Sequence, residues 1–269
     1  MSLIKRFVVA CGIIYLASAV VMVVFQRQLL YIPSTEMRTP TSVGLTDVTV
    51  EALETPDGET LVLWYAQAPE GRPTVLFFHG NGGDISGRAG RFAAYRRAGY
   101  GVAFLSWRGY GGSTGAPSET GLLTDARTAY DWLIIQGVSP DQIVLAGESL
   151  GTGVAVQLAA ERPSGAMTLG APYSAAVDVA ADLYWWLPVR YLMWDQFRSI
   201  DHIGRVTAPT LIQHGTTDRV IPYASGRALY EATTPPTTFQ TMEGVGHEAL
   251  YRAETWAQEI AFLDEVFTR

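Results

Sequence analysis

The chain has 269 residues, 48% of them hydrophobic, which is enough to bury the core of one large domain. The formal net charge of −7, with no cluster of basic residues, argues against a nucleic-acid partner. The single cysteine, Cys11, excludes an intrachain disulfide and a metal site built from cysteines.

The N-terminal segment is long and apolar enough to cross a membrane. Residues 7–25 carry no charge, and a helix over them spans roughly 28 Å, close to the ~30 Å hydrocarbon core of a bilayer. Lys5 and Arg6 precede it, which favours a cytoplasmic N-terminus and a globular domain outside the cytoplasm. We therefore predict a single-pass anchor. A cleaved signal peptide is the alternative, because residues 17–19 resemble a cleavage site.

The sequence divides into three parts. We predict the anchor over residues 1–28, a linker that packs on the surface over 29–45, and a globular domain over 46–269. The domain begins with alternating apolar and polar residues over 47–53 and 60–66, separated by turn residues. This pattern predicts a β-hairpin at one edge of a sheet.

From residue 74 onwards, short apolar runs alternate with helical patterns. Strands are predicted at 74–78, 101–106, 142–146, 166–170, 210–214 and 237–242, and helices at 85–98, 120–136, 152–162, 224–232 and 249–267. A continuous apolar run is typical of a strand that is covered on both faces. The alternation therefore predicts an α/β fold, with about eight mostly parallel strands and helices on both faces of the sheet.

One segment departs from this alternation. Residues 172–206 are too long for a simple connection. We predict a short helical lid whose aromatic and apolar side chains line a pocket or touch the bilayer. The residues expected in this role are Trp185, Trp186, Leu187, Tyr191, Met193 and Trp194. The alternatives are helices that simply pack on the sheet and a surface that binds a protein partner.

A serine lies between two glycines where a predicted strand meets a predicted helix. The motif is Gly-Glu-Ser-Leu-Gly at residues 147–151. In this context it has the form of a nucleophile elbow, in which a strained turn lifts the serine hydroxyl into the open near a helix N-terminus. A free serine hydroxyl is a poor nucleophile and needs a base. The sequence therefore predicts Ser149 as a nucleophile that requires an acid and a histidine.

In this architecture the acid and then the histidine follow the serine along the chain. His247, in a glycine-rich loop after the last predicted strand, fits the general base. Asp218, in the loop after the preceding strand, fits the carboxylate that orients and stabilises the imidazole. Glu243 is the alternative acid. Asp201 fits less well because it lies in the long insertion.

A second glycine-rich segment, residues 79–83, follows the predicted strand 74–78 directly. Glycines allow the backbone to approach a substrate closely. We predict an oxyanion hole formed by the backbone N–H of Leu150 and that of Asn81, with Gly80 as the alternative donor. A phosphate-binding loop is the competing interpretation, but no Lys-Ser/Thr pair follows these glycines.

These motifs occur in the order that one large family of enzymes uses. On residues 79–83, residues 147–151, the Asp218 loop and the His247 loop, the chain resembles the α/β-hydrolase superfamily from about residue 45 to its C-terminus. The match to several motifs in order is far more specific than any one of them. The resemblance implies a serine hydrolase.

A narrower resemblance concerns the substrate. Residues 107–115 and 117–119 resemble a subgroup of membrane-anchored serine hydrolases, which includes monoacylglycerol and lysophospholipid lipases and protein depalmitoylases. This resemblance implies ester or thioester substrates with acyl chains. The depalmitoylases attach to membranes through a lipidated cysteine cluster, whereas this chain has an apolar segment and one cysteine. Protein depalmitoylation is therefore the less expected activity.

The sequence as a whole predicts a membrane-anchored serine hydrolase that cleaves carboxylic acyl esters through an acyl-enzyme. This chemistry requires no cofactor and no metal. The expected partners are a small acyl ester or lipid substrate and the membrane itself. An acyl-protein thioesterase, a peptidase and a catalytically idle, membrane-tethered binding protein are the alternative interpretations.

Overall fold

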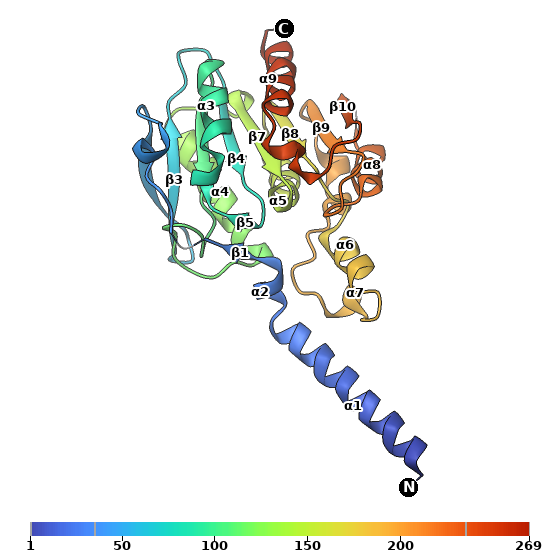
Figure 1. Cartoon of the computed structure of the whole chain (residues 1–269). Coiled ribbons are helices and arrows are strands. Elements are labelled where there is room, and N and C mark those ends of the chain that lie inside the picture. The colour runs from blue at the N-terminus through green and yellow to red at the C-terminus, as the bar shows by residue number, and fades with distance from the viewer. Residues whose placement is uncertain (1, 35, 235, 269) are drawn as a thin grey trace.

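The computed structural model describes residues 2–34, 36–234 and 236–268. Its centre is an eight-stranded sheet (Figure 1). The strands lie in the order β10 (Thr237–Met242), β9 (Thr210–Gly215), β8 (Ala166–Gly170), β7 (Ile143–Glu148), β4 (Thr74–Phe78), β6 (Gly101–Leu105), β3 (Thr60–Ala66) and β2 (Thr49–Glu54). Neighbouring strands are parallel except around β3, which is antiparallel to both β2 and β6. The predicted α/β fold with a mostly parallel sheet is confirmed.

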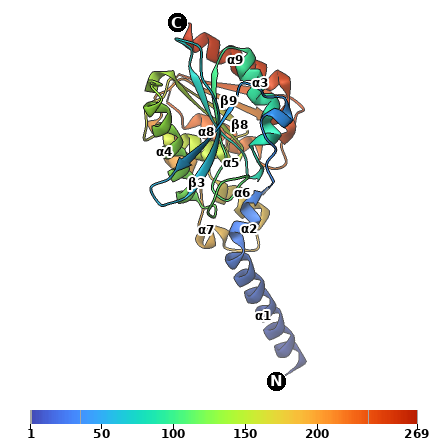
Figure 2. The ribbon, with the colours of Figure 1, turned by 90° about the vertical axis from the view of Figure 1, so that its left-hand side faces the viewer.

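Helices cover both faces of the sheet (Figure 2). One layer contains α3 (Ala89–Arg97) and α9 (Ala253–Phe267), and the other contains α4 (Glu119–Ile135), α5 (Leu150–Ala159) and α8 (Tyr223–Glu231). Each layer encloses its own apolar core, because successive side chains of a strand point to opposite faces. On β4, Val75 and Phe77 pack into one core, and Leu76 and Phe78 pack into the other. Burial on both faces explains why this strand is apolar throughout.

Two helices are shorter than the sequence pattern predicts. The predicted helix 85–98 is a 3₁₀ turn, η2 (Ile85–Arg88), followed by α3. The predicted helix 249–267 is likewise a 3₁₀ turn, η6 (His247–Tyr251), followed by α9. The break occurs because Arg88 and Arg252, at the two junctions, leave the α-helical backbone conformation. The remaining 3₁₀ turns are η1 (Thr41–Val43), η3 (Pro140–Gln142), η4 (Ser199–Asp201) and η5 (Ile203–Arg205).

The N-terminal segment begins with α1 (Leu3–Val24), which extends away from the domain and has no buried residue (Figure 1). Among the described residues it is the one helix long and apolar enough to cross a membrane, with a mean hydropathy of 2.7. The chain then packs on the domain through α2 (Gln26–Leu30) and β1 (Ile32–Pro33), which pairs with β5 (Gly82–Gly83). Pairing with β5 joins the segment that follows α1 to the predicted oxyanion segment, residues 79–83.

The long insertion after β8 contains the short helices that the sequence predicts. They are α6 (Ala176–Leu183) and α7 (Val189–Leu192), followed by the turns η4 and η5. Helices α6 and α7 lie on the side of the domain from which α1 extends (Figure 1). The insertion and the apolar N-terminal helix are therefore neighbours in space, although they are far apart in the sequence.

The turn at the end of β7 depends on glycine at position 151. A Cβ atom added there would lie 2.6 Å from the carbonyl carbon of Phe78 and 2.8 Å from the carbonyl oxygen of His79. These are backbone atoms of the adjacent strand and loop, so a rotation of a side chain cannot relieve the clash. We expect Gly151→Ala to lower the free energy of unfolding by about 3 kcal/mol, measured by urea denaturation. Gly87→Ala is the control, since its Cβ would meet nothing within 4 Å. Equal denaturation midpoints would contradict this steric argument.

Candidate active site

Ser149 occupies the tight turn between β7 and α5. Its φ of 49° lies in the left-handed region that non-glycine residues seldom adopt. The turn is held by the Ser149 N–H, which donates to the carbonyl oxygen of Gly170 at 2.9 Å. A Cβ atom at Gly147 would lie 2.8 Å from the Cα of Thr152. The strand, strained turn and helix that a nucleophile elbow requires are therefore all present.

Asp218 and His247 come together from the loops after β9 and β10. The Oδ2 atom of Asp218 lies 2.7 Å from Nδ1 of His247. Its Oδ1 atom accepts hydrogen bonds from the backbone N–H groups of Val220 and Ile221 at 2.8 and 3.0 Å. Burial alone would raise the pKa of this carboxyl, but the hydrogen bonds from His247 and the two amides hold the pKa below its usual value. An ionised carboxylate is thus fixed against the imidazole.

This arrangement determines which imidazole nitrogen is free. In the neutral tautomer whose Nδ1–H donates to the Asp218 carboxylate, Nε2 is the nitrogen that can accept a proton. Ser149 and His247 both follow strands of the parallel part of the sheet, so they lie at the same edge. Within residues 2–34, 36–234 and 236–268, no hydrogen bond joins the Ser149 hydroxyl to His247. Contacts of this kind often tighten only when substrate binds.

The alternative acids lie elsewhere. Glu243 is exposed, and the described part of the chain gives it no hydrogen bond or ion pair with His247. Asp201 pairs with Arg198 at 2.6 Å within the insertion. Of the three carboxylates considered from the sequence, Asp218 is the one that the fold brings to His247.

His214 is a second histidine beside Asp218 that the sequence did not assign to the site. Its Nε2 lies 3.6 Å from Oδ2 of Asp218 and 3.0 Å from the carbonyl oxygen of Ile221. Burial lowers its pKa, so the neutral ring donates to Ile221. His214 therefore forms part of the wall around Asp218. A sequence signal for this contact was available, because His214 lies near the end of a buried strand and four residues before Asp218.

The segment 79–83 lies beside the elbow. A Cβ atom at Gly80 would be 3.4 Å from that of Ser149. The Gly80 N–H already donates to Oε1 of Glu148 at 3.2 Å. By contrast, Asn81 and Leu150 line a cavity with Ser149, and among the described residues their backbone N–H groups have no acceptor. The geometry thus favours Asn81 over Gly80 as an oxyanion donor.

A buried ion pair behind the elbow holds this segment in place. Glu148 is the residue before Ser149. Its Oε1 atom lies 2.8 Å from Nε and 2.7 Å from Nη2 of Arg88. Nη1 of Arg88 donates to the carbonyl oxygens of Gly82 and Asp84 at 2.9 and 3.0 Å. Arg88 therefore ties the segment 79–83 to the strand that carries Ser149. Sequence reasoning missed this clamp, although a glutamate in an otherwise apolar strand pattern was a signal for it.

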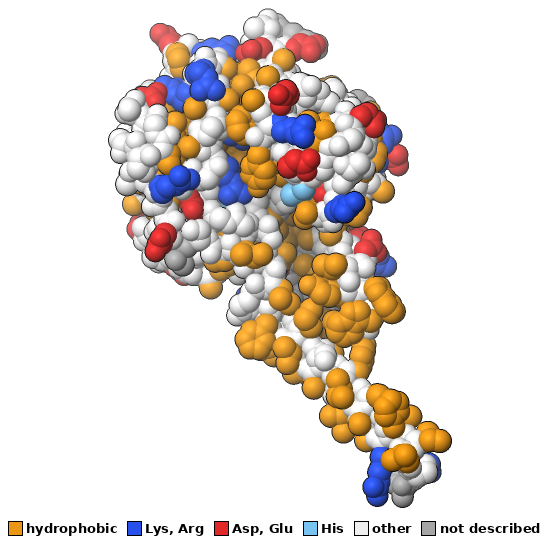
Figure 3. All heavy atoms as spheres, in the orientation of Figure 1, with side chains coloured by type: hydrophobic (Ala, Val, Ile, Leu, Met, Phe, Trp, Pro, Cys, Tyr) orange, Lys and Arg blue, Asp and Glu red, His pale blue; other side chains and the backbone are white. Residues whose placement is uncertain are grey.

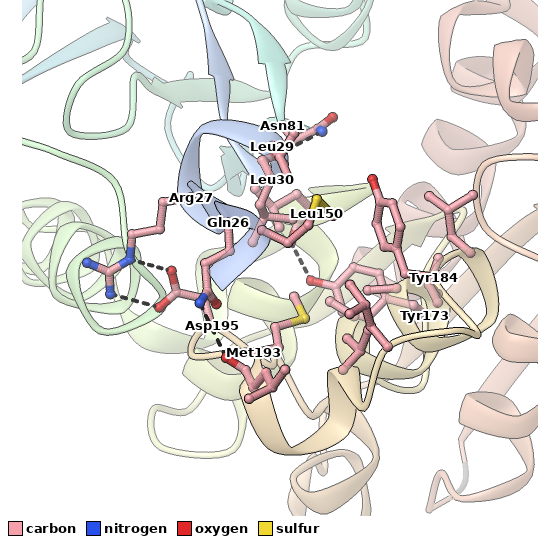
Figure 4. Close-up of a pocket in the computed structure, with 18 of the residues that line it drawn as sticks. Gln26, Arg27, Leu29, Leu30, Asn81, Leu150, Tyr173, Tyr184, Met193 and Asp195 are labelled. Atoms are coloured by element: carbon pink, nitrogen blue, oxygen red, sulfur yellow. Dashed lines mark hydrogen bonds and ion pairs between the residues drawn. The ribbon is translucent and has the colours of Figure 1, made fainter. Parts of the chain in front are cut away.

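Ser149 is one of the residues that line a cavity of about 280 Å³, which Figure 4 shows in close-up. This volume is near the lower end of the range for small-molecule sites. The cavity is lined mainly by apolar residues from the elbow, the insertion and the N-terminal helices. The N-terminal contributors are Met22, Val23, Gln26, Arg27, Leu29 and Leu30. The sequence assigned these residues to the anchor and linker, and no local pattern marked them as part of a pocket.

The predicted lid residues divide into two groups. Leu187 and Met193 line the cavity. Four aromatic residues lie outside the lining and are 40–91% exposed, which leaves contact with the bilayer as the other predicted role for them: Trp185, Trp186, Tyr191 and Trp194. Helix α7 is a single turn, which is too short for periodicity in the sequence to show which side faces inward.

The N-terminal helix α2 is fastened to the end of the insertion by an ion pair (Figure 4). Arg27 donates from Nε and Nη2 to the carboxylate of Asp195 at 2.8 and 3.1 Å. The hydroxyl of Tyr31 donates to the same carboxylate at 3.1 Å. Gln26 adds a bond from its side-chain amide to the Leu192 carbonyl oxygen at 3.3 Å. The cavity wall built from the N-terminal segment is thus held by specific polar contacts.

Comparisons with known proteins agree with the fold. The sequence profile of the α/β hydrolase fold family matches residues 73–192. An uncharacterised protein of Mycobacterium tuberculosis is 40% identical over 86% of this chain and 84% of its own length. Alpha/beta hydrolase domain-containing protein 17B of Xenopus tropicalis is 32% identical over 75% of this chain and 68% of its own length. The esterase Pf2001 of Pyrococcus furiosus has the same fold, with a TM-score of 0.71 at 16% identity over 88% of this chain and 98% of that chain. The chain belongs to the α/β-hydrolase superfamily.

Proposed function

We propose that the protein is a serine hydrolase that cleaves carboxylic acyl esters, with Ser149 as nucleophile, His247 as general base and Asp218 as the orienting acid. The observation that carries this proposal is the 2.7 Å contact between Asp218 and His247. That carboxylate is held by two further backbone amides, which suits a group that must keep an imidazole in one orientation. The strained turn at Ser149 supports the nucleophile role.

The reaction proceeds in two halves. His247 takes the proton from the Ser149 hydroxyl as its oxygen attacks the acyl carbonyl, and the N–H groups of Asn81 and Leu150 donate to the resulting oxyanion. The imidazolium, stabilised by Asp218, gives its proton to the leaving alcohol, which leaves an acyl-enzyme. His247 then takes a proton from a water that attacks the acyl carbonyl, and returns this proton to the Ser149 oxygen as the acyl–oxygen bond breaks and the acid is released. Each oxyanion donor is worth roughly 3 kcal/mol in the transition state.

The surroundings of Ser149 support an apolar acyl group and a membrane location. The lining of the cavity is mainly apolar, so an acyl chain loses contact with water when it enters. We assign α1 as a retained anchor, because its Tyr15 hydroxyl donates to the carbonyl oxygen of Trp186 at 3.1 Å. Lys5 and Arg6 support an N-terminus in the cytoplasm and a domain outside it.

A fluorophosphonate probe tests the proposal directly. The wild-type chain should become labelled, because the probe reacts only with an activated serine hydroxyl. Ser149→Ala should not be labelled and should lose about 10⁶-fold in kcat with p-nitrophenyl esters of graded chain length. Circular dichroism verifies that the variant is folded. A folded wild-type chain that takes no label would instead favour an idle, membrane-tethered binding protein.

A further inference from the structure

Five large apolar side chains of the insertion are exposed on the surface of the protein. We call this group the insertion face, and it consists of Leu183, Trp185, Trp186, Tyr191 and Trp194, which are 68, 82, 40, 91 and 57% exposed. In Figure 3 this apolar surface continues into that of α1 without a charged boundary. An exposed apolar patch of this kind marks a binding surface, and tryptophan and tyrosine are the side chains enriched where a bilayer meets water.

A contact between the insertion face and α1 indicates how deep this face would lie in a bilayer that α1 crosses. The Tyr15 hydroxyl reaches the Trp186 carbonyl oxygen, and the two rings meet edge to face with centroids 6.2 Å apart. Tyr15 precedes Val24, the last residue of α1, by nine residues. Nine residues are about 14 Å along a helix, or about 10–13 Å in depth at tilts of 20–40°. If α1 crosses a bilayer, Trp186 lies below the level at which α1 leaves it.

The last turn of α1 and the predicted nucleophile line the same cavity. Met22 and Val23, in the last turn of α1, line the cavity that also contains Ser149. Leu183 belongs both to the cavity lining and to the insertion face. Val220, near the predicted acid, lines the cavity and is 56% exposed. The lining therefore includes an exposed residue of the insertion face and an exposed residue of the loop that carries Asp218.

We propose that the insertion face is embedded in the near leaflet of the bilayer, and that α1 forms one wall of the acyl site as well as anchoring the chain. The acyl chain of a membrane lipid ester then enters the cavity sideways between α1 and α6. Its ester reaches Ser149 without passing through water, and the alcohol leaves beside Val220. The volume of about 280 Å³ suits a single acyl chain. This inference rests on the proposed function for the identity of the ester.

The position of the insertion face can be measured without any enzyme activity. In a chain carrying Cys11→Ser, Trp185→Cys is labelled with a fluorophore, and the full chain is reconstituted into phosphatidylcholine vesicles containing nitroxide-labelled lipid. We expect the nitroxide to quench the label strongly. The control is Ile135→Cys in the same background, since Ile135 on α4 is 80% exposed and should give no quenching. Equal, weak quenching at both positions would overturn the proposal and would favour a protein-binding surface.

The role of α1 as a wall is tested by two neighbouring substitutions. Val23→Trp places a large side chain in the cavity, whereas Val24→Trp places it on the exposed side of the same turn. We measure the ratio of kcat/KM for p-nitrophenyl palmitate in vesicles to that for p-nitrophenyl acetate. The ratio should fall about tenfold or more for Val23→Trp and stay at the wild-type value for Val24→Trp.

The outcomes of this pair of variants are distinguishable from a failure of the proposed function. The same ratio in both variants and in the wild type would overturn the role of α1 as a wall. A wild-type chain that hydrolyses neither ester would contradict the proposed function instead. The quenching measurement would still report whether the insertion face lies in the bilayer.

Discussion

Asp218→Asn is expected to lower kcat for p-nitrophenyl acetate by about 10⁴-fold while the fold is retained. The native carboxylate accepts Nδ1–H of His247 at 2.7 Å and stays ionised because its pKa is held below the usual value. A neutral amide cannot stabilise the imidazolium, and its NH₂ group favours the wrong tautomer of His247. Steady-state kinetics with the short ester give the loss, and circular dichroism verifies the fold.

The matched control for this substitution is Glu243→Gln. Glu243 is exposed and follows the neighbouring strand β10, so its loss of charge should leave kcat within about twofold of wild type, as for most surface changes. Full activity in Asp218→Asn, with loss of activity in Glu243→Gln, would move the acid role to Glu243.

The same carboxylate predicts a dependence of stability on pH. A carboxyl whose pKa is lower in the folded chain than in the unfolded chain stabilises the fold above about pH 4, the ordinary value. This contribution is lost as the pH falls through the folded pKa. Asp218→Asn removes it, so the difference in stability between wild type and variant should shrink as the solution is acidified.

Arg91→Ala is expected to lower the free energy of unfolding by about 3–5 kcal/mol. The Arg91 side chain is 3% exposed, and its Nη2 lies 2.6 Å from the fully buried carboxylate of Glu259. Its Nη1 lies 3.6 Å from Glu148, the residue before the predicted nucleophile. Removing the guanidinium leaves the Glu259 charge buried without a cation, because its other partners, Thr168 and Tyr95, are neutral hydroxyls. Urea denaturation measures the loss.

An exposed pair provides the comparison for Arg91. Arg198 lies 2.6 Å from Asp201, but the two side chains are 46 and 51% exposed, so Arg198→Ala should cost less than about 1 kcal/mol. Adding Glu259→Leu to Arg91→Ala should recover much of the loss, because it removes the unpaired buried charge. If Arg91→Ala were as mild as Arg198→Ala, the ion pair would not be the source of the stability.

Where a feature depends on neighbours along the chain, the sequence was sufficient to predict it. The strands at 166–170 and 237–242 were predicted with the bounds that the structure has, because short runs with turn residues at both ends leave little choice of length. The turn at Ser149 follows from two glycines, which are needed because side chains there would strike adjacent backbone. Parallel strands then bring the residues that follow them to one edge, where Asp218 contacts His247; the order of motifs by itself left Glu243 as an alternative acid.

Contacts between distant segments could not be predicted in this way. Arg27 contacts Asp195, which is 168 residues away in the sequence, and Arg88 contacts Glu148, which is 60 residues away. The residues around an arginine in the sequence do not indicate which carboxylate it will contact in the folded chain. The same holds for the aromatic residues of the insertion, whose outward direction depends on how α6 and α7 pack against α1 and α2. Local steric and hydrogen-bonding preferences thus specify the elements and the elbow. The cavity walls, the buried ion pairs and the exposed aromatic face arise only when the folded chain brings the N-terminal helices, the insertion and the sheet edge into contact.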